Sequence, residues 1–182
     1  SDFTNQDILL DLVRYRSTSS EKLISLKEYK DRMKDDQKEI FFITGKNGKA
    51  LSTSPLLEAY RKNDIEVLIM DEEFDEVISS ALTKYKDIDI KNIESVEAPT
   101  TVTEDEKKEF DESFKDVTTK IKDVLGDRVK NVVVSTRLNN SASCIVADKD
   151  DPMAQMATMM KAMGQEVPKS APILEINPEH SL

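Results

Sequence analysis

The sequence has no tryptophan, one cysteine (Cys144), one histidine (His180) and only four glycines in 182 residues. One cysteine excludes a disulfide within the chain, and it fits a reducing compartment. One histidine excludes both a histidine-based triad and a multi-histidine metal site built by this chain alone. No apolar run approaches the roughly 20 residues that span a bilayer. We therefore expect a soluble, cytoplasmic protein without a membrane segment, and we expect Cys144 to be a small core residue.

Basic residues are outnumbered by acidic ones. Lys and Arg total 26 and Asp and Glu total 36, so the net charge is −10. A phosphate backbone or an anionic membrane needs a basic footprint, so the charge argues against nucleic-acid and membrane partners. The carboxylates cluster in polar stretches without apolar neighbours that would raise a pKa. The sequence therefore predicts no catalytic site and no metal site in this chain.

The stretch from Lys38 to Met70 is typical of a strand, a helix and a second strand. Residues 39–44 and 65–70 are short runs rich in β-favouring apolar residues. Between them Ser54 can cap a helix, and Pro55 suits its first position, where no N–H donor is needed. This βαβ pattern predicts two parallel strands in one sheet, and their continuous apolar character indicates helices on both faces.

The rest of the first half extends this module. The pattern predicts an opening helix over 7–13, a break at 14–20, and a helix over 25–34 that begins with the capping box of Ser25 and Glu28. A helix over 72–85 and a strand over 88–93 follow. The fold class is therefore α/β (α+β overall), in which a small three-layer βαβ module precedes a second, α+β module.

The second module follows an acidic, solvated stretch over 94–112 that contains Pro99. Thr103 and Glu106 form another capping box, and apolar residues every three or four positions predict one long amphipathic helix that ends at Gly126. We expect a strand over 129–138, a turn at 139–141, a strand over 142–147 that returns beside it, and a last strand over 172–177. We place the domain boundary between residues 95 and 96.

Methionine is concentrated in one predicted helix, which starts at Pro152 and stops at Gly164. Five of the seven methionines lie there and share one side of the helix. These residues are Met153, Met156, Met159, Met160 and Met163. A methionine face is adaptable and polarizable, which favours a binding surface for variable partners. An ordinary buried helix face would show the same spacing, and composition leaves both interpretations open.

The loop Gly45-Lys-Asn-Gly-Lys49 stands where a doubly wound sheet could bind a phosphate. It lacks the GxxxxGK[ST] pattern, and the predicted helix starts only at Ser54, so the loop is not next to free helix amides. We expect a surface turn. A small α/β enzyme or phosphate binder that uses this loop is the weaker alternative.

Several long motifs resemble the ninety-kilodalton heat-shock protein family, bacterial HtpG type. They are SLKEYKDRMKDDQKEIFFITG from Ser25, SPLLEAYRKNDIEVLIM from Ser54, LGDRVKNVVVSTRL from Leu125 and GQEVPKSAPILEINPEH from Gly164. Members of this family are ATP-driven, stress-induced chaperones that work as homodimers and hold partly folded client proteins. The resemblance implies that residues 1–95 are the end of a middle domain, and that residues 96–182 begin a C-terminal dimerisation domain without its last helices. We therefore expect an excised fragment.

The resemblance also implies which activities lie outside this chain. In the family, the ATP and Mg site and the arginine that reaches ATP are upstream, and the helices that join two protomers are downstream. We expect no cofactor, no ATPase activity and weak or absent dimerisation here. The family's client-contacting helix matches Met156, Met159 and Met160, with Met153 and Met163 nearby. The alternative is a purely structural module that couples the ATPase and dimerisation elements without touching clients.

Overall fold

The computed structural model describes residues 8, 10–71, 82–100, 102–152, 156, 160 and 170–181. The chain forms two compact units, Ser1–Pro99 and Thr100–Leu182, which we call unit 1 and unit 2. The division therefore comes four residues later than the boundary expected between residues 95 and 96. Most of the helix predicted over 72–85 lies outside the described residues. The fold is α/β, with mixed sheets and helices.

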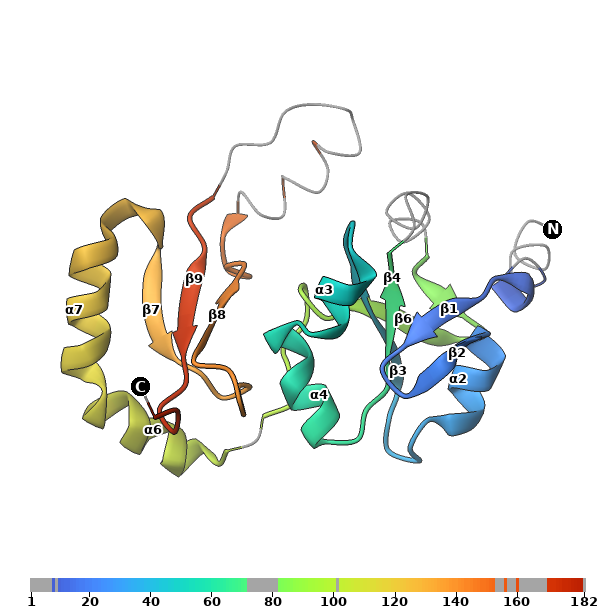
Figure 1. Cartoon of the computed structure of the whole chain (residues 1–182), viewed down its shortest axis with the longest axis horizontal. Helices are drawn as coiled ribbons and strands as arrows, with labels where there is room; N and C mark the ends of the chain where they lie inside the picture. Colours follow the sequence, from blue (N-terminus) through green and yellow to red (C-terminus); the bar gives the residue numbers. More distant parts are fainter. Residues whose placement is uncertain are drawn as a thin grey trace. The chain divides into compact units, whose positions relative to one another are not determined.

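Unit 1 is organised around a six-stranded mixed sheet with the order β2-β1-β4-β3-β6-β5 (Figure 1). Its central strands β3, β4 and β6 run parallel, and β1, β2 and β5 add antiparallel pairs at the two sides. The bounds of the strands are β1 Tyr15–Ser17, β2 Ser20–Ile24, β3 Glu39–Thr44, β4 Val67–Met70, β5 Lys84–Tyr85 and β6 Ile88–Asn92. The predicted parallel pairing of the two βαβ strands is confirmed, with Phe42 opposite Leu68.

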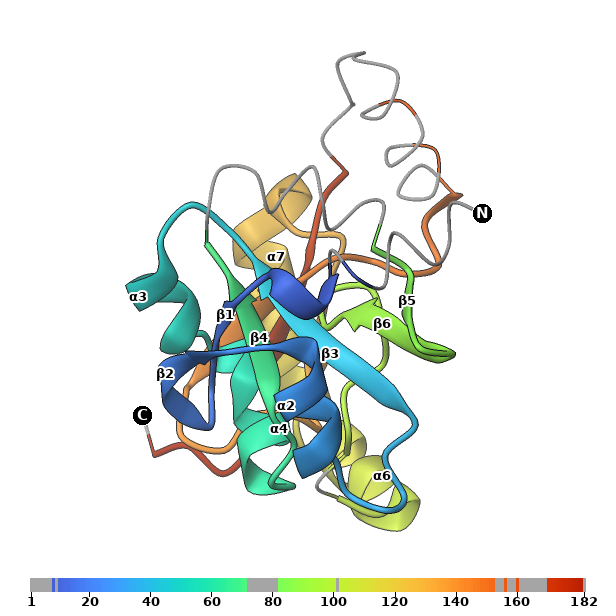
Figure 2. The ribbon, with the colours of Figure 1, turned by 90° about the vertical axis from the view of Figure 1, so that its right-hand side faces the viewer.

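The helices of unit 1 lie on both sides of β3 and β4. Helix α2 (Leu26–Arg32) is on one side, and α4 (Glu58–Lys62) is on the other (Figure 2). The capping box predicted for α2 is present: the Ser25 hydroxyl accepts from the Glu28 N–H at 3.2 Å, and the Glu28 carboxylate accepts from the Ser25 N–H at 2.8 Å. Ser54 also caps, but the helix that it starts is a single 3₁₀ turn, Pro55–Leu57, that leads into α4.

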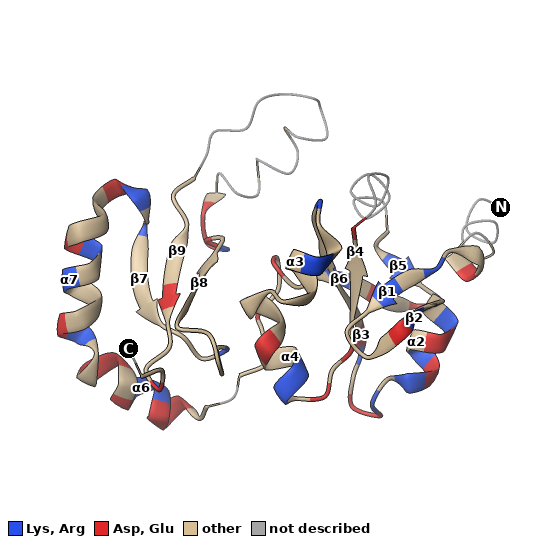
Figure 3. Ribbon diagram, viewed as in Figure 1, with Lys and Arg blue, Asp and Glu red and all other residues tan. Residues whose placement is uncertain are grey.

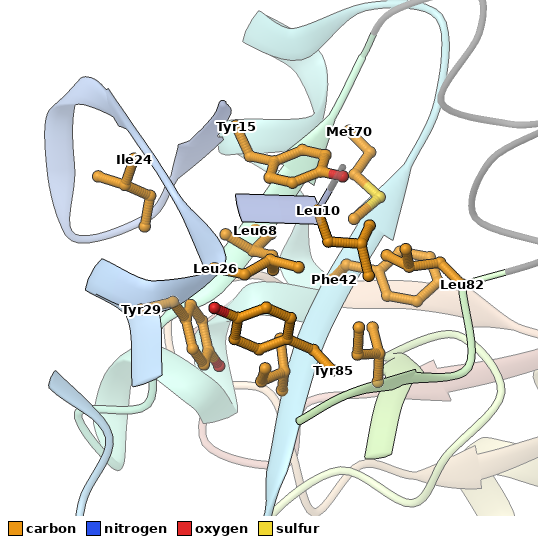
Figure 4. Packing of buried hydrophobic residues seen from close by; sticks show 12 residues of the cluster. Leu10, Tyr15, Ile24, Leu26, Tyr29, Phe42, Leu68, Met70, Leu82 and Tyr85 are labelled. Atoms are coloured by element: carbon orange, nitrogen blue, oxygen red, sulfur yellow. The ribbon is translucent and has the colours of Figure 1, made fainter. Parts of the chain in front are cut away.

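Alternating residues of β3 and β4 fill two cores, one on each face of the sheet. Ile40, Phe42, Leu68 and Met70 pack beneath α2 with the residues shown in Figure 4. Ile43, Val67 and Ile69 pack on the other face with Leu57 and Tyr60. Because a strand side chain changes face at every residue, continuous apolar strands need cover on both sides. The predicted three-layer arrangement is confirmed.

Two predictions that concern the strands of unit 1 are wrong. The hydroxyl-rich residues 14–20 do not merely interrupt a helix, because Tyr15–Ser17 and Ser20–Ile24 form a β-hairpin that joins the sheet beside β4. Tyr85, assigned to the face of a helix over 72–85, lies in strand β5. The hairpin was missed because its turn is Thr18-Ser19 rather than the Asn-Gly or Asp-Gly type that marks tight hairpins in a sequence.

Unit 2 contains a three-stranded sheet of β7 (Asn131–Val134), β8 (Ser143–Val146) and β9 (Ile173–Ile176). The order is β7-β9-β8, so the last strand inserts between the first two (Figure 1). Strand β9 runs parallel to β7 and antiparallel to β8. The predicted hairpin between 129–138 and 142–147 is therefore wrong, although both segments contain a strand. The turn at 139–141 connects two strands that belong to one sheet but are not neighbours.

Two helices of unit 2 pack beside β7. The capping box at Thr103 is confirmed, since its N–H donates to the Glu106 carboxylate at 2.7 Å, and it starts α6 (Glu104–Ser113). The single long helix predicted up to Gly126 breaks at Phe114, and α7 (Lys115–Leu125) follows. Acidic positions crowd α6 (Figure 3). Neither helix buries a residue fully, so both lie on the surface of the unit.

Candidate functional site

The predicted methionine surface is represented in the structure by two of its five residues. Met156 is 56% exposed, and Met160 is half-buried. The backbone is helical at both positions. Met153, Met159 and Met163 lie outside the described residues. The assignment of these five side chains to client contact therefore stays a prediction, and the exposure of Met156 is the structural observation that bears on it.

The sheet of unit 2 determines where the methionine segment is attached. Residues 147–172 connect β8 to β9, and these strands are antiparallel neighbours with Val146 opposite Ile173. The connection therefore leaves and re-enters the sheet at the same end. At that end the Lys130 ammonium forms an ion pair with the buried Asp148 carboxylate, and the Ser170 hydroxyl donates to the Asp151 carboxylate. The described ends of the connection are thus tied by polar contacts.

Unit 2 exposes further large apolar side chains that the sequence did not single out. They are Val117 at 42%, Val124 at 77% and Ile145 at 60% exposure. Ile145 lies on the edge strand β8, opposite the half-buried Leu174 of β9. The next pair along these strands is Val146 and Ile173, the last of their pairing. Alternation in β8 puts Cys144 inside, as expected from the sequence, and Ile145 outside.

A buried carboxylate lies on the sheet of unit 2. Glu175, the acidic position of β9 (Figure 3), accepts hydrogen bonds from the Ser135 hydroxyl at 2.8 Å and from Arg137 Nε at 3.0 Å. The Cys144 thiol lies 3.8 Å from the same oxygen. This geometry is that of a satisfied buried ion pair. Cys144 is buried, as expected for a small core residue.

Unit 1 has a comparable pair beside a polar recess. The Glu66 carboxylate accepts from Arg32 Nη2 at 2.7 Å, from Arg32 Nε at 3.1 Å and from the Ser17 hydroxyl at 2.5 Å. The Tyr29 hydroxyl donates to the Glu66 carbonyl, and burial raises the pKa of Tyr29 to about 12. The recess is lined by Ser19, Tyr29, Arg32, Met33, Gln37, Asp64 and Glu66. The Glu66 carboxylate is thus held by three hydrogen bonds from Arg32 and Ser17, which is the geometry of a structural ion pair.

The Gly45–Lys49 loop is not built to bind phosphate. Contrary to the predicted surface turn, Gly48 begins a short helix, α3 (Gly48–Ser52), which Asn47 caps. The Asp71 carboxylate lies against Gly48, so close that a Cβ on residue 48 would come within 1.9 Å of Oδ2. An anionic side chain already stands where a phosphate would approach this helix N-terminus. The glycine is explained by this close approach.

The part of the chain that the structure describes contains no candidate metal site and no membrane-spanning helix. No group of three or more His, Cys, Asp or Glu side chains there could hold a metal ion. None of the helices among those residues is long and apolar enough to cross a membrane.

Comparison with known proteins shows the family. The model of the family described as "Hsp90 protein" matches residues 1–182, and the chain therefore belongs to the Hsp90 family. The resemblance stated from the sequence motifs is confirmed.

Among its relatives is "Chaperone protein HtpG" of Sulfurovum sp. (strain NBC37-1), which is 50% identical over 183 residues that cover 100% of this chain and 30% of the relative. The protein of the same name from Aliarcobacter butzleri (strain RM4018) is 52% identical over 186 residues, 100% of this chain and 29% of the relative. The chain thus spans about 30% of the length of these relatives.

A solved structure, the middle domain of a heat shock protein of Plasmodium falciparum, aligns with 51% of this chain and 40% of its own chain. The sequence identity is 36% and the TM-score is 0.47, which is too low to support an assignment of the units.

Proposed function

We propose that this chain is the client-binding and structural part of an ATP-dependent molecular chaperone, and that it holds partly folded proteins against the methionine surface. This surface comprises Met153, Met156, Met159, Met160 and Met163. The observation that carries the proposal is the 56% exposure of Met156 in a member of the Hsp90 family. Unit 1 would be the end of a middle domain, and unit 2 the start of a C-terminal dimerisation domain.

The proposed contact is non-covalent and apolar. Partly folded proteins expose apolar surface, and covering it gains about 25 cal/mol per Å². A methionine side chain is unbranched and polarizable, so one surface can fit clients of different shape. The excess of acidic residues in the chain as a whole favours solubility while apolar side chains stay exposed.

The test uses the full-length protein with Met156→Ser and Met160→Ser. Light scattering should show that the double variant suppresses aggregation of an unfolding client less well than the wild type. Leu23→Ser is the matched control, because Leu23 is 57% exposed but lies in unit 1. The control should keep full activity. Wild-type suppression by a folded double variant would contradict the client contact.

A structural role without client contact is the second candidate, and the half-burial of Met160 favours it. If this side chain packs within unit 2, a serine there costs packing and buries a hydroxyl. Met160→Ser alone would then lower the melting temperature by several degrees, while client binding per folded molecule would stay the same. The client-contact proposal expects Met156→Ser to reduce binding without changing the melting temperature.

We propose that the ATP and Mg site, the ATPase activity and the main homodimer contacts lie outside this chain. We also propose that the protein acts in the cytoplasm. The support for placing the nucleotide site elsewhere is the fraction of the relatives that the chain spans and the Asp71 carboxylate beside Gly48. Titrating ATP and Mg into this chain while recording amide NMR spectra tests the first part. Saturable shifts would contradict it.

A further inference from the structure

Three segments of unit 2 meet at the end of the sheet from which the methionine segment leaves. Lys130 precedes β7, Asp148 follows β8, and Pro172 precedes β9. The Lys130 backbone N–H donates to the Pro172 carbonyl at 2.7 Å, and its Nζ donates to Asp148 Oδ2 in an ion pair. One residue therefore contacts both the beginning and the end of the 147–172 connection.

The contacts continue on both sides of this ion pair. The second carboxylate oxygen of Asp148 accepts from the Asp150 N–H at 3.0 Å, and the Asp148 carbonyl accepts from the Asp151 N–H at 3.4 Å. The Asp151 carboxylate in turn accepts from the Ser170 hydroxyl. A closed circuit of contacts thus joins the entrance of the connection to its exit without using the methionines.

The two charges of the pair differ in burial. The Asp148 side chain is 6% exposed, whereas that of Lys130 is 52% exposed. A buried carboxylate is stable in its charged form only with a partner, so Asp148 depends on Lys130 more than Lys130 depends on Asp148. The Lys130 ammonium also lowers the pKa of Asp148 through their hydrogen bond. Removing the Lys130 charge would therefore leave the buried Asp148 carboxylate without its partner, whereas removing the Asp148 charge would leave an ammonium that water can solvate.

We propose that Lys130 is a positioning residue that holds the entrance and exit of the β8–β9 connection together, and so fixes how Met156 and Met160 are presented. The clamp itself stands on the contacts at Asp148 and Pro172. Only its benefit to client binding rests on the proposed function.

Hydrogen exchange measured by mass spectrometry on the full-length protein tests the clamp. Lys130→Met keeps the length of the side chain and removes its charge, whereas Lys130→Arg keeps the charge. We expect Lys130→Met to speed exchange in peptides from 147 to 172 by about tenfold, with little change in β7 or in unit 1. Lys130→Arg should stay within about twofold of the wild type. Lys120→Met, an exposed lysine of α7, is the control and should change nothing.

A general loss of structure is separated from a loss of the clamp by a second variant. Lys130→Met with Asp148→Asn leaves no unpaired buried charge, so β7–β9 should be protected in this double variant even if Lys130→Met alone weakens the sheet. The clamp predicts that exchange at 147–172 stays fast in this double variant. Exchange there at the wild-type rate, in either the single or the double variant with a folded sheet, would overturn the proposal.

The same variants keep this proposal distinct from the proposed function. If Lys130→Met loosens the connection and Met156→Ser with Met160→Ser leaves aggregation suppression intact, the clamp stands and the client contact fails. If the methionine variants lose suppression and Lys130→Met leaves exchange unchanged, the client contact stands and the clamp fails.

Discussion

Among the residues of unit 1 that the structure describes, eleven large side chains are less than 2% exposed, including Tyr29, Tyr60 and Leu68. In the described part of unit 2, the buried apolar side chains are fewer and smaller, at 5–8% exposure: Val129, Val132, Val134, Leu138 and Cys144. Unit 1 covers both faces of its sheet, whereas α6 and α7 bury none of their residues fully. The two units therefore differ in how completely their cores are buried, although both expose large apolar side chains, such as Leu12 in unit 1 and Val124 in unit 2.

Truncation in the two cores should give the largest contrast. Leu68→Ala removes a side chain with 0% exposure at the centre of unit 1 and should cost unit 1 about 2–5 kcal/mol. Val134→Ala in unit 2 removes two methyl groups at 7% exposure and should cost about 1–2 kcal/mol. Native-state hydrogen exchange, which reports each unit separately, measures both losses. Equal losses would show that the core of unit 2 is as well sealed as that of unit 1.

The two buried glutamates should respond differently when their arginines are removed. The Arg137 side chain is 11% exposed and that of Arg32 is 42% exposed. Arg137→Met would leave Glu175 buried without a counter-charge and should cost about 3 kcal/mol or more. Arg32→Met should cost less, because Glu66 lines a recess from which water can approach its carboxylate. Urea unfolding of each variant gives the two free energies. A larger loss for Arg32→Met would contradict this ranking.

Gly48 and Gly126 should be required for different reasons, Gly48 because a Cβ would clash and Gly126 because of its positive φ. Gly48→Ala in unit 1 would bring its Cβ against the Asp71 carboxylate, whereas Gly126 in unit 2 has a φ of +56° and nothing within 4 Å of a Cβ. Each change to alanine should cost about 1–2 kcal/mol. Asp71→Gly should rescue Gly48→Ala and leave Gly126→Ala unchanged, as a double-mutant cycle by thermal melting would show. Without rescue at Gly48, the close approach to Asp71 would not be the reason for the glycine.

The smallest effect on stability is expected at the two capping boxes, which have the same hydrogen bonds in unit 1 and in unit 2. Hydrogen bonds from the Ser25 and Thr103 backbone and hydroxyl groups lower the pKa of Glu28 and of Glu106 from the ordinary value of 4.5. A lowered pKa means that each carboxylate stabilises its helix fully above about pH 4.5, and that this contribution is lost as the pH falls through the lowered value. Amide NMR shifts of α2 and α6 between pH 6 and pH 3 should follow these titrations. Glu28→Gln and Glu106→Gln should each remove one of them, and an unchanged titration would contradict the assignment.

Local signals in the sequence predicted local structure well. The strand at 39–44, the two capping boxes and the parallel βαβ pair all follow from residues close in sequence, and all are confirmed. The order of strands in unit 2 was missed because no residue of 129–147 shows that 173–176 will insert between them. The ion pair of Lys130 and Asp148 was missed for the same reason, since the two residues are 18 apart in sequence and look like ordinary surface charges. The break at Phe114 was hidden by an apolar period that runs through it.

The strand order of unit 2 also has a consequence for biosynthesis. Because β9 lies between β7 and β8 among the strands that the structure describes, neither of them can pair with it until residues 173–176 have left the ribosome. A nascent chain that has reached residue 163 therefore contains the segments of β7 and β8 and all five methionines of the methionine surface, but not yet β9. Until β9 is made, the edges of these two strands are open, and open strand edges favour aggregation.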